Sequence, residues 1–293
     1  MVSFLRALVD LTLVKKQRVC IDFRNTVKCY SDGTLLFYAE LQRILARRPN
    51  TITCKAPRNR VAGQVLCHLG ILKQLGYTKD IPSERDDVTH WQRFAGRYAD
   101  ATQGVGQAID DLQGLGREQI RYLFRSVSEA LTNVTQHAYI EQRMDGSGHP
   151  SDAGWWMFVR EEPDELQVCF CDLGVGVPYS VPRNSKHSTW FSTRMGSVLQ
   201  AFGIHSHRDA ETIQVTVDEK RSRFELTHRG NGFGNMLESV AKAESGRLII
   251  NSNRGAYMYS SAAGKATHLT RNYEDSIFGT VVAWSIKLPK GEA

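Results

Sequence analysis

The stretch that decides the fold is SEALTNVTQHAY, residues 128–139. Apolar residues recur through it and the preceding residues at three- and four-residue steps, which predicts an amphipathic helix of about five turns over 117–138. Glu129, Asn133 and His137 follow one another at four-residue steps, so they share the face opposite the apolar stripe. A solvated polar surface explains this trio as well as a binding site does.

A second motif, DLGVGVP, occupies residues 172–178 directly after an apolar strand. Asp172 supplies an acceptor at the strand end, while Gly174 and Gly176 let the backbone approach a planar ligand. A dinucleotide-binding motif is excluded because the third glycine would fall at Tyr179 and Pro178 interrupts the turn. A tight turn without a ligand is the alternative interpretation.

Two further glycine motifs follow. RGNGFGN at 229–235 precedes a helix predicted over 233–243, and its glycines expose successive N–H groups that suit polyphosphate. A flexible loop before a helix is the alternative. FGTVV at 278–282 opens the last predicted strand, over 280–288.

In order and spacing these four segments resemble the N, G1, G2 and G-T boxes of GHKL (histidine-kinase-like) ATPases. Residues 128–139 are especially similar to the N box of anti-sigma-factor serine kinases. The resemblance covers 117–290 and implies a Bergerat-type α/β sandwich, a helical layer on a mixed sheet, with ATP and Mg²⁺ as cofactors. The resemblance also implies roles for the site residues. On the helix, Asn133 would ligate Mg²⁺, Glu129 would orient or deprotonate the attacking group, and His137 would contact phosphate or be only hydrogen-bonded in its helix. Around the base, Asp172 would accept from the adenine amino group, with Gly174 and Gly176 shaping the pocket and Thr280 nearby, while Gly230, Gly232 and Gly234 would face the phosphates.

About 50 residues separate Pro178 from Gly230, more than in the compact anti-sigma kinases. We expect residues 179–229 to form a lid that is mobile without nucleotide and ordered with it. His205, His207 and Asp209 also leave open a zinc site in this segment, although no further ligand pair accompanies them.

The N-terminal part alternates strands at 18–23 and 51–54 with helices at 35–46 and 61–75. Residues 20–23 and 30–36 resemble part of a STAS (anti-anti-sigma-like) domain, in which a serine begins a helix. Ser31 is the matching position, and we interpret it first as an ordinary N-cap and second as a phosphosite. We therefore expect a small α/β STAS-like domain over 1–77, a linker over 78–116 with a helix near 91–98, and the GHKL domain over 117–293.

Composition agrees with a soluble α/β protein, with 41% hydrophobic and 23% charged residues. We expect a cytoplasmic location, because no signal peptide or membrane-spanning run is present, and six reduced cysteines, with Cys169 and Cys171 on one strand face. The net charge of +6 does not indicate nucleic acid. The expected partners are a regulatory target or neighbouring-gene product, and a second copy of the chain in a homodimer.

Two functions fit this sequence. The first is a regulatory ATPase or serine/threonine protein kinase, and the alternative is a non-catalytic ATP-gated interaction module. A sensor histidine kinase is disfavoured because no histidine lies in the usual phospho-acceptor pattern. Chaperone and topoisomerase relatives would need large additional domains.

Overall fold

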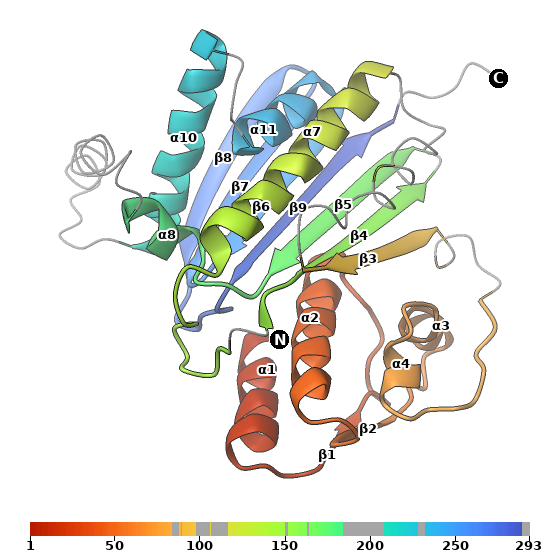
Figure 1. Cartoon of the computed structure of the whole chain (residues 1–293). Helices are drawn as coiled ribbons and strands as arrows, with labels where there is room; N and C mark the ends of the chain where they lie inside the picture. The colour runs from red at the N-terminus through yellow and green to blue at the C-terminus, as the bar shows by residue number, and fades with distance from the viewer. Residues whose placement is uncertain are drawn as a thin grey trace.

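The structure is a computed structural model of the whole chain. It describes residues 1–83, 88, 90–97, 106, 117–149, 152–162, 164–183, 208–227 and 232–288. A seven-stranded sheet lies at the centre, with helices on both of its faces (Figure 1). The chain is therefore an α/β protein, as the sequence predicted.

The central sheet has the strand order β3-β4-β5-β9-β6-β7-β8, and every neighbouring pair is antiparallel. The expected mixed sheet was therefore wrong for the described strands. Short hairpin turns join β4 to β5, β6 to β7 and β7 to β8, and such turns permit only antiparallel pairing. The bounds are β3 (Trp91–Gly96), β4 (Trp155–Glu162), β5 (Glu165–Asp172), β6 (Ser245–Ser252), β7 (Gly255–Ala262), β8 (Lys265–Asn272) and β9 (Thr280–Lys287).

One face of the sheet is covered by α7, α10 and α11 (Figure 1). The apolar stripe of α7 buries Leu123, Val127 and Leu131 against the strands, as its spacing predicted. At its C-terminal end, α7 continues into a π-helical segment, η3. The bounds are α7 (Arg117–Asn133), η3 (Val134–Ala138), α8 (Val177–Arg183), α10 (Asp209–Thr227) and α11 (Gly232–Lys242).

The N-terminal elements lie on the other face (Figure 1). Helix α2 packs on β4, β5 and β9, so that its Leu35 and Leu41 share a core with Phe158 and Cys171. Beside it, β1 and β2 form a two-stranded parallel sheet. The bounds are α1 (Val2–Val9), η1 (Asp10–Val14), β1 (Val19–Asp22), α2 (Ser31–Arg47), β2 (Ile52–Lys55), α3 (Arg60–His68) and α4 (Ile71–Gln74).

Most predicted elements are confirmed, with two exceptions. The helix expected over 61–75 is broken between α3 and α4, because Gly70 has φ 71° and so leaves the right-handed helical region. The helix expected over 91–98 was wrong. Residues 91–96 form β3, which pairs with β4 and thereby joins the large sheet.

Part of the segment expected as a lid belongs to the core. Helix α10 begins at Asp209, and its Ile213 and Val217 are fully buried. Residues 184–207 and 228–231, which include Gly230, His205 and His207, lie outside the described residues. Over the ranges that the structure describes, no helix has the length and apolarity that a membrane span requires.

Candidate functional site

Asp172 and Thr280 meet at the end of the sheet, directly opposite each other in the register of β5 and β9. Both residues are 7% exposed. The Asp172 carboxylate accepts a hydrogen bond of 2.9 Å from the Gly174 N–H and two more from the N–H and hydroxyl of Thr280. Because a carboxylate offers about four acceptor positions, about one remains for an outside donor.

The same carboxyl carries an electrostatic penalty. Burial raises the pKa of Asp172 to about 6, although the hydrogen bonds from Gly174 and Thr280 and the charge of Arg143 act in the opposite direction. The group is therefore ionised at neutral pH inside a buried environment. A buried strand-end carboxylate with a raised pKa is typical of binding sites.

The loop after Asp172 is held closely between two other elements. A side chain at Gly174 would place its Cβ only 2.1 Å from the Ala138 carbonyl oxygen, at the end of η3. The same oxygen accepts a 2.7 Å hydrogen bond from the Val175 N–H. On the other side, Gly176 has φ 82°, and its Cβ would meet the Asn253 side chain. Both glycines are thus required by the close approach of neighbouring backbone and side chains.

Two further residues line the region around Asp172 and its loop, and neither was predicted from the sequence. Ser252, at the end of β6, accepts a 2.9 Å hydrogen bond from the Val177 N–H and lies 3.0 Å from the Thr280 hydroxyl. Tyr139 donates to the Gly154 carbonyl at 2.6 Å and accepts from the Leu173 N–H at 3.1 Å. A small polar residue at the inward end of a buried strand could have indicated Ser252, but nothing local indicated the distant partners of Tyr139.

Glu129 and Asn133 lie half-buried on α7, next to the buried Ala130 and Val134. Glu129 lies one α-helical turn, about 6 Å along the axis, before Asn133. Helix η3 begins at Val134, so the α-helical geometry expected through Ala138 was wrong there. A π turn has about 4.4 residues, so the four-residue step still leaves the half-buried His137 near the face of Glu129 and Asn133.

The glycines of the third motif are only partly described. Gly232 is the first residue of α11, and Gly234 lies in its first turn, where N–H groups have no partner within the helix. Helix α11 packs along α7. The described residues therefore place Asp172, Gly174, Gly176 and Thr280 together, with α7 and the start of α11 in the same helical layer.

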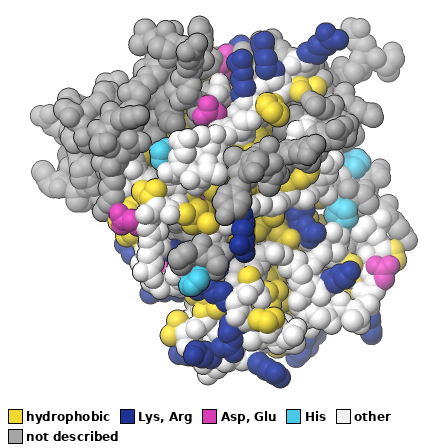
Figure 2. All heavy atoms as spheres, viewed as in Figure 1, with side chains coloured by type: hydrophobic (Ala, Val, Ile, Leu, Met, Phe, Trp, Pro, Cys, Tyr) yellow, Lys and Arg dark blue, Asp and Glu magenta, His cyan; other side chains and the backbone are white. Residues whose placement is uncertain are grey.

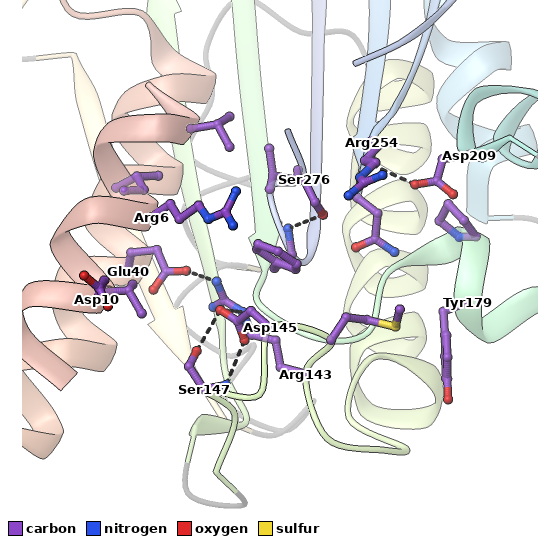
Figure 3. A pocket seen from close by; sticks show the side chains of 18 of the residues that line it. Arg6, Asp10, Glu40, Arg143, Asp145, Ser147, Tyr179, Asp209, Arg254 and Ser276 are labelled. Atoms are coloured by element: carbon purple, nitrogen blue, oxygen red, sulfur yellow. Dashed lines mark hydrogen bonds and ion pairs between the residues drawn. The ribbon is translucent and has the colours of Figure 1, made fainter. Parts of the chain in front are cut away.

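Buried ions connect the loop after η3 to α2. Arg143 pairs with Glu40 of α2 and lies 3.3 Å from Asp145 (Figure 3). Arg43 of α2 donates to Glu40 at 2.9 Å and to the Ser147 carbonyl at 2.9 Å. The Arg143 guanidinium also stands 5.6 Å from the centre of the Phe278 ring, two residues before Thr280. The N-terminal layer therefore contacts the segments that carry Tyr139 and Thr280.

A cavity of about 730 Å³ opens beside this ion cluster (Figure 3). Helix α1 forms one wall through Leu5 and Arg6, and the turn at Asn253 and Arg254 forms another. Its lining contains three arginines and four carboxylates: Arg6, Arg143 and Arg254 with Asp10, Glu40, Asp145 and Asp209. The cavity therefore has no evident excess charge to select an ion.

Ser31 does not act as the helix cap that the sequence suggested. Tyr30 is the N-cap of α2, and no side chain caps the helix. The Ser31 hydroxyl instead forms a hydrogen bond with the Cys169 thiol. Phosphorylation at Ser31 stays a prediction.

The prediction of free cysteines is confirmed. All six cysteines are free, and Cys169 and Cys171 are buried on one face of β5. Burial raises the pKa of Cys169 to about 12. Figure 2 shows Lys and Arg side chains at several separate places over the N-terminal layer. Within the described ranges, no three His, Cys, Asp or Glu side chains converge as a metal cluster would require.

No protein-family model matches this chain, and no curated protein matches it either.

Proposed function

We propose that this chain binds Mg²⁺-ATP between α7 and the ends of β5 and β9, as a regulatory ATPase or serine/threonine kinase of the GHKL type. The observation that carries the proposal is the buried Asp172–Thr280 pair, which leaves about one carboxylate acceptor position open. An adenine amino group supplies one hydrogen of the kind that this position accepts. The STAS-like resemblance of residues 1–77 belongs to the same proposal.

The residues of the helical layer suit the other end of the nucleotide. Asn133 offers an amide oxygen, a ligand that Mg²⁺ accepts, and this ion usually completes its shell with phosphate and water. The first-turn N–H groups of α11 at Gly232 and Gly234 suit phosphate oxygens. Bound Mg²⁺-ATP would supply the phosphoryl group, and its Mg²⁺ would neutralise part of the negative charge of the phosphates.

Glu129 would act on the attacking group. It stands one helical turn from Asn133 on the same face of α7, so its carboxylate can accept a proton from a water or hydroxyl held beside the metal ligand. The half-buried position limits competition from bulk water without removing the charge.

The buried ions between α2 and the segment at 143–147 favour the second function, an ATP-gated interaction module. Arg43 and Glu40 reach from the N-terminal layer to Ser147 and Arg143. If this segment moves on nucleotide binding, it would therefore displace α2, and no chemical step is needed.

Incubation of the full chain with ATP labelled at the γ-phosphate separates these functions. Free phosphate indicates an ATPase, labelled protein after addition of a candidate partner indicates a kinase, and retained intact ATP indicates a gated module. Absence of any Mg²⁺-dependent retention, release or transfer would overturn the proposal. A Glu129→Ala chain is the control for the chemical step, because it should retain ATP.

A further inference from the structure

Phe278 has an unusual backbone conformation directly before the residues that face Asp172. Its φ is 48°, a left-handed value that is uncommon for residues other than glycine. Such a conformation persists only where the surrounding structure holds it. The next residue, Gly279, lies so close to the end of β5 that a Cβ there would overlap the Asp172 carbonyl oxygen. The placing of Phe278 therefore decides how Thr280, at the start of β9, meets Asp172.

Two kinds of contact hold the segment that contains Phe278. Its backbone is fixed by hydrogen bonds, since the Phe278 N–H donates to the Ser276 hydroxyl at 3.1 Å and the Ile277 N–H donates to the Asn253 carbonyl at 2.9 Å. Its ring lies against a different element, because the guanidinium of Arg143 stands 5.6 Å from the ring centre. This distance is within the range of a cation–π contact. Arg143 therefore holds the side chain of Phe278.

The side chain of Arg143 is itself fixed by carboxylates from two parts of the chain. It is 6% exposed, pairs with Glu40 of α2 and lies 3.3 Å from Asp145 of its own loop (Figure 3). Glu40 is buried and also accepts a 2.9 Å hydrogen bond from Arg43. A planar guanidinium can bind a carboxylate and stack on an aromatic ring at the same time. The N-terminal layer thus sets the position of Arg143.

The charge of Arg143 also acts on the acceptor of the site. Burial raises the pKa of Asp172, and Arg143 acts in the opposite direction and lowers it. Tyr139 and Cys171, which also lie near this carboxyl, stay protonated because burial raises the pKa of each group. Arg143 therefore favours the ionised form of Asp172, which is the form that accepts a hydrogen bond most strongly.

We propose that Arg143 is a positioning residue for adenine recognition, which seats Thr280 against Asp172 through its contact with Phe278. This inference rests on the proposed function, because the contact of Asp172 with the adenine amino group belongs to that proposal. It adds a regulatory element to the site. Glu40 holds Arg143, so the N-terminal layer contributes to how the other domain distinguishes one nucleotide base from another.

The test compares ATP with inosine triphosphate (ITP), which has a carbonyl oxygen where adenine has the amino group. The ratio of the two affinities isolates the contact with Asp172. Wild type should prefer ATP by about tenfold or more, because a hydrogen bond to a charged acceptor contributes that much. Arg143→Gln should lower this preference by about three- to tenfold, a common size for coupling between neighbouring residues, and leave the affinity for ITP unchanged. A partly unfolded variant would instead lose both affinities equally.

Two variants serve as controls. Arg143→Lys keeps the charge but lacks the planar group, so it should recover only part of the preference for ATP. Arg160→Gln is the matched control, because Arg160 also pairs with a carboxylate, Glu162, and stands 5.3 Å from the ring centre of Trp91. Arg160 lies on β4 away from the end that faces Asp172, so this variant should keep the wild-type preference. Circular dichroism confirms that each variant is folded.

Urea denaturation without nucleotide tests the link between Arg143 and Asp172 independently of binding. Without the guanidinium, Asp172 should ionise at a higher pH. The gain in the free energy of unfolding from Asp172→Asn between about pH 5 and pH 8 should therefore be larger in the Arg143→Gln background than in wild type. Equal gains would overturn the inference. An ATP preference that Arg143→Gln leaves unchanged would overturn the inference alone, whereas a wild type without any preference for ATP would overturn the proposed adenine contact as well.

Discussion

The buried carboxyl of Asp172 should make the fold less stable as the pH rises. Its pKa lies near 6 in the folded chain, against an ordinary value of 3.8. A raised folded-state pKa means that the folded chain binds the proton more tightly than the unfolded chain does. The resulting stabilisation is complete below pH 3.8 and is lost as the pH rises through about 6. At about 1.4 kcal/mol per pKa unit, the ionised group then costs about 3 kcal/mol.

Asp172→Asn removes the titration while nearly preserving the shape of the side chain. By linkage, the ionisation penalty in the wild type is about 1.6 kcal/mol at pH 5 and about 3 kcal/mol at pH 8. The free energy of unfolding of the variant, relative to wild type, should therefore increase by about 1.4 kcal/mol between these two pH values. Hydrogen bonds that the amide cannot reproduce shift the variant equally at both pH values, so they cancel in this difference.

Urea denaturation of both proteins at pH 5 and pH 8 measures this quantity. A variant that gains stability relative to wild type on going to pH 8 supports a buried, penalised carboxylate. If the difference between the two proteins is the same at both pH values, Asp172 titrates normally. The Asp172 carboxylate would then lack the electrostatic property that is typical of a binding group.

Three other predictions concern turnover, packing and thiol chemistry. Glu129→Ala should retain Mg²⁺-ATP in a filter-binding assay yet lose about 10²- to 10⁴-fold in turnover if Glu129 is the general base; unchanged turnover would place the base elsewhere. Gly174→Ala should lower the free energy of unfolding by about 1–3 kcal/mol or more, because its Cβ meets the Ala138 carbonyl oxygen. Gly33→Ala within α2 is its control and should be neutral or stabilising, since its Cβ has only a 3.8 Å contact. In a thiol titration of the native protein at pH 8, the exposed Cys20 should react while Cys169 and Cys171 stay protected; rapid reaction of either would contradict their burial.

Periodicity predicted the elements that are amphipathic or strongly apolar. Helices α2, α7 and α11 and strands β5 and β9 each bury a face that is readable from the spacing of apolar residues. Strand β8 has no such face, because its sequence is KATHLTRN and it lies at the edge of the sheet. Strand β3 was mistaken for a helix because its pairing with β4, in which Trp91 lies opposite Arg160 in a distant part of the sequence, is a non-local property.

The site could be predicted only where a motif is local. The Asp172 turn and its glycines were found because the residue types are consecutive in the chain. The structural reason for these residue types was not visible in the sequence. Position 174 must be a glycine because η3 ends against it, and Thr280 faces Asp172 because β9 lies between β5 and β6. The π segment that begins at Val134 was not visible in the spacing of the sequence, although it leaves His137 near the face of Glu129 and Asn133.

Calorimetric titration of Mg²⁺-ATP into the wild type, Asp172→Ala and Asn133→Ala tests the nucleotide site most directly. Asp22→Ala is the control, because Asp22 also ends a strand but is exposed and paired with Arg24. We predict saturable binding to the wild type and the control, and a loss of about 1.5–3 kcal/mol for Asp172→Ala. Asn133→Ala should bind without the enhancement that Mg²⁺ gives the wild type. Absence of binding to the wild type, or equal binding by all four proteins, would contradict the assignment of this site.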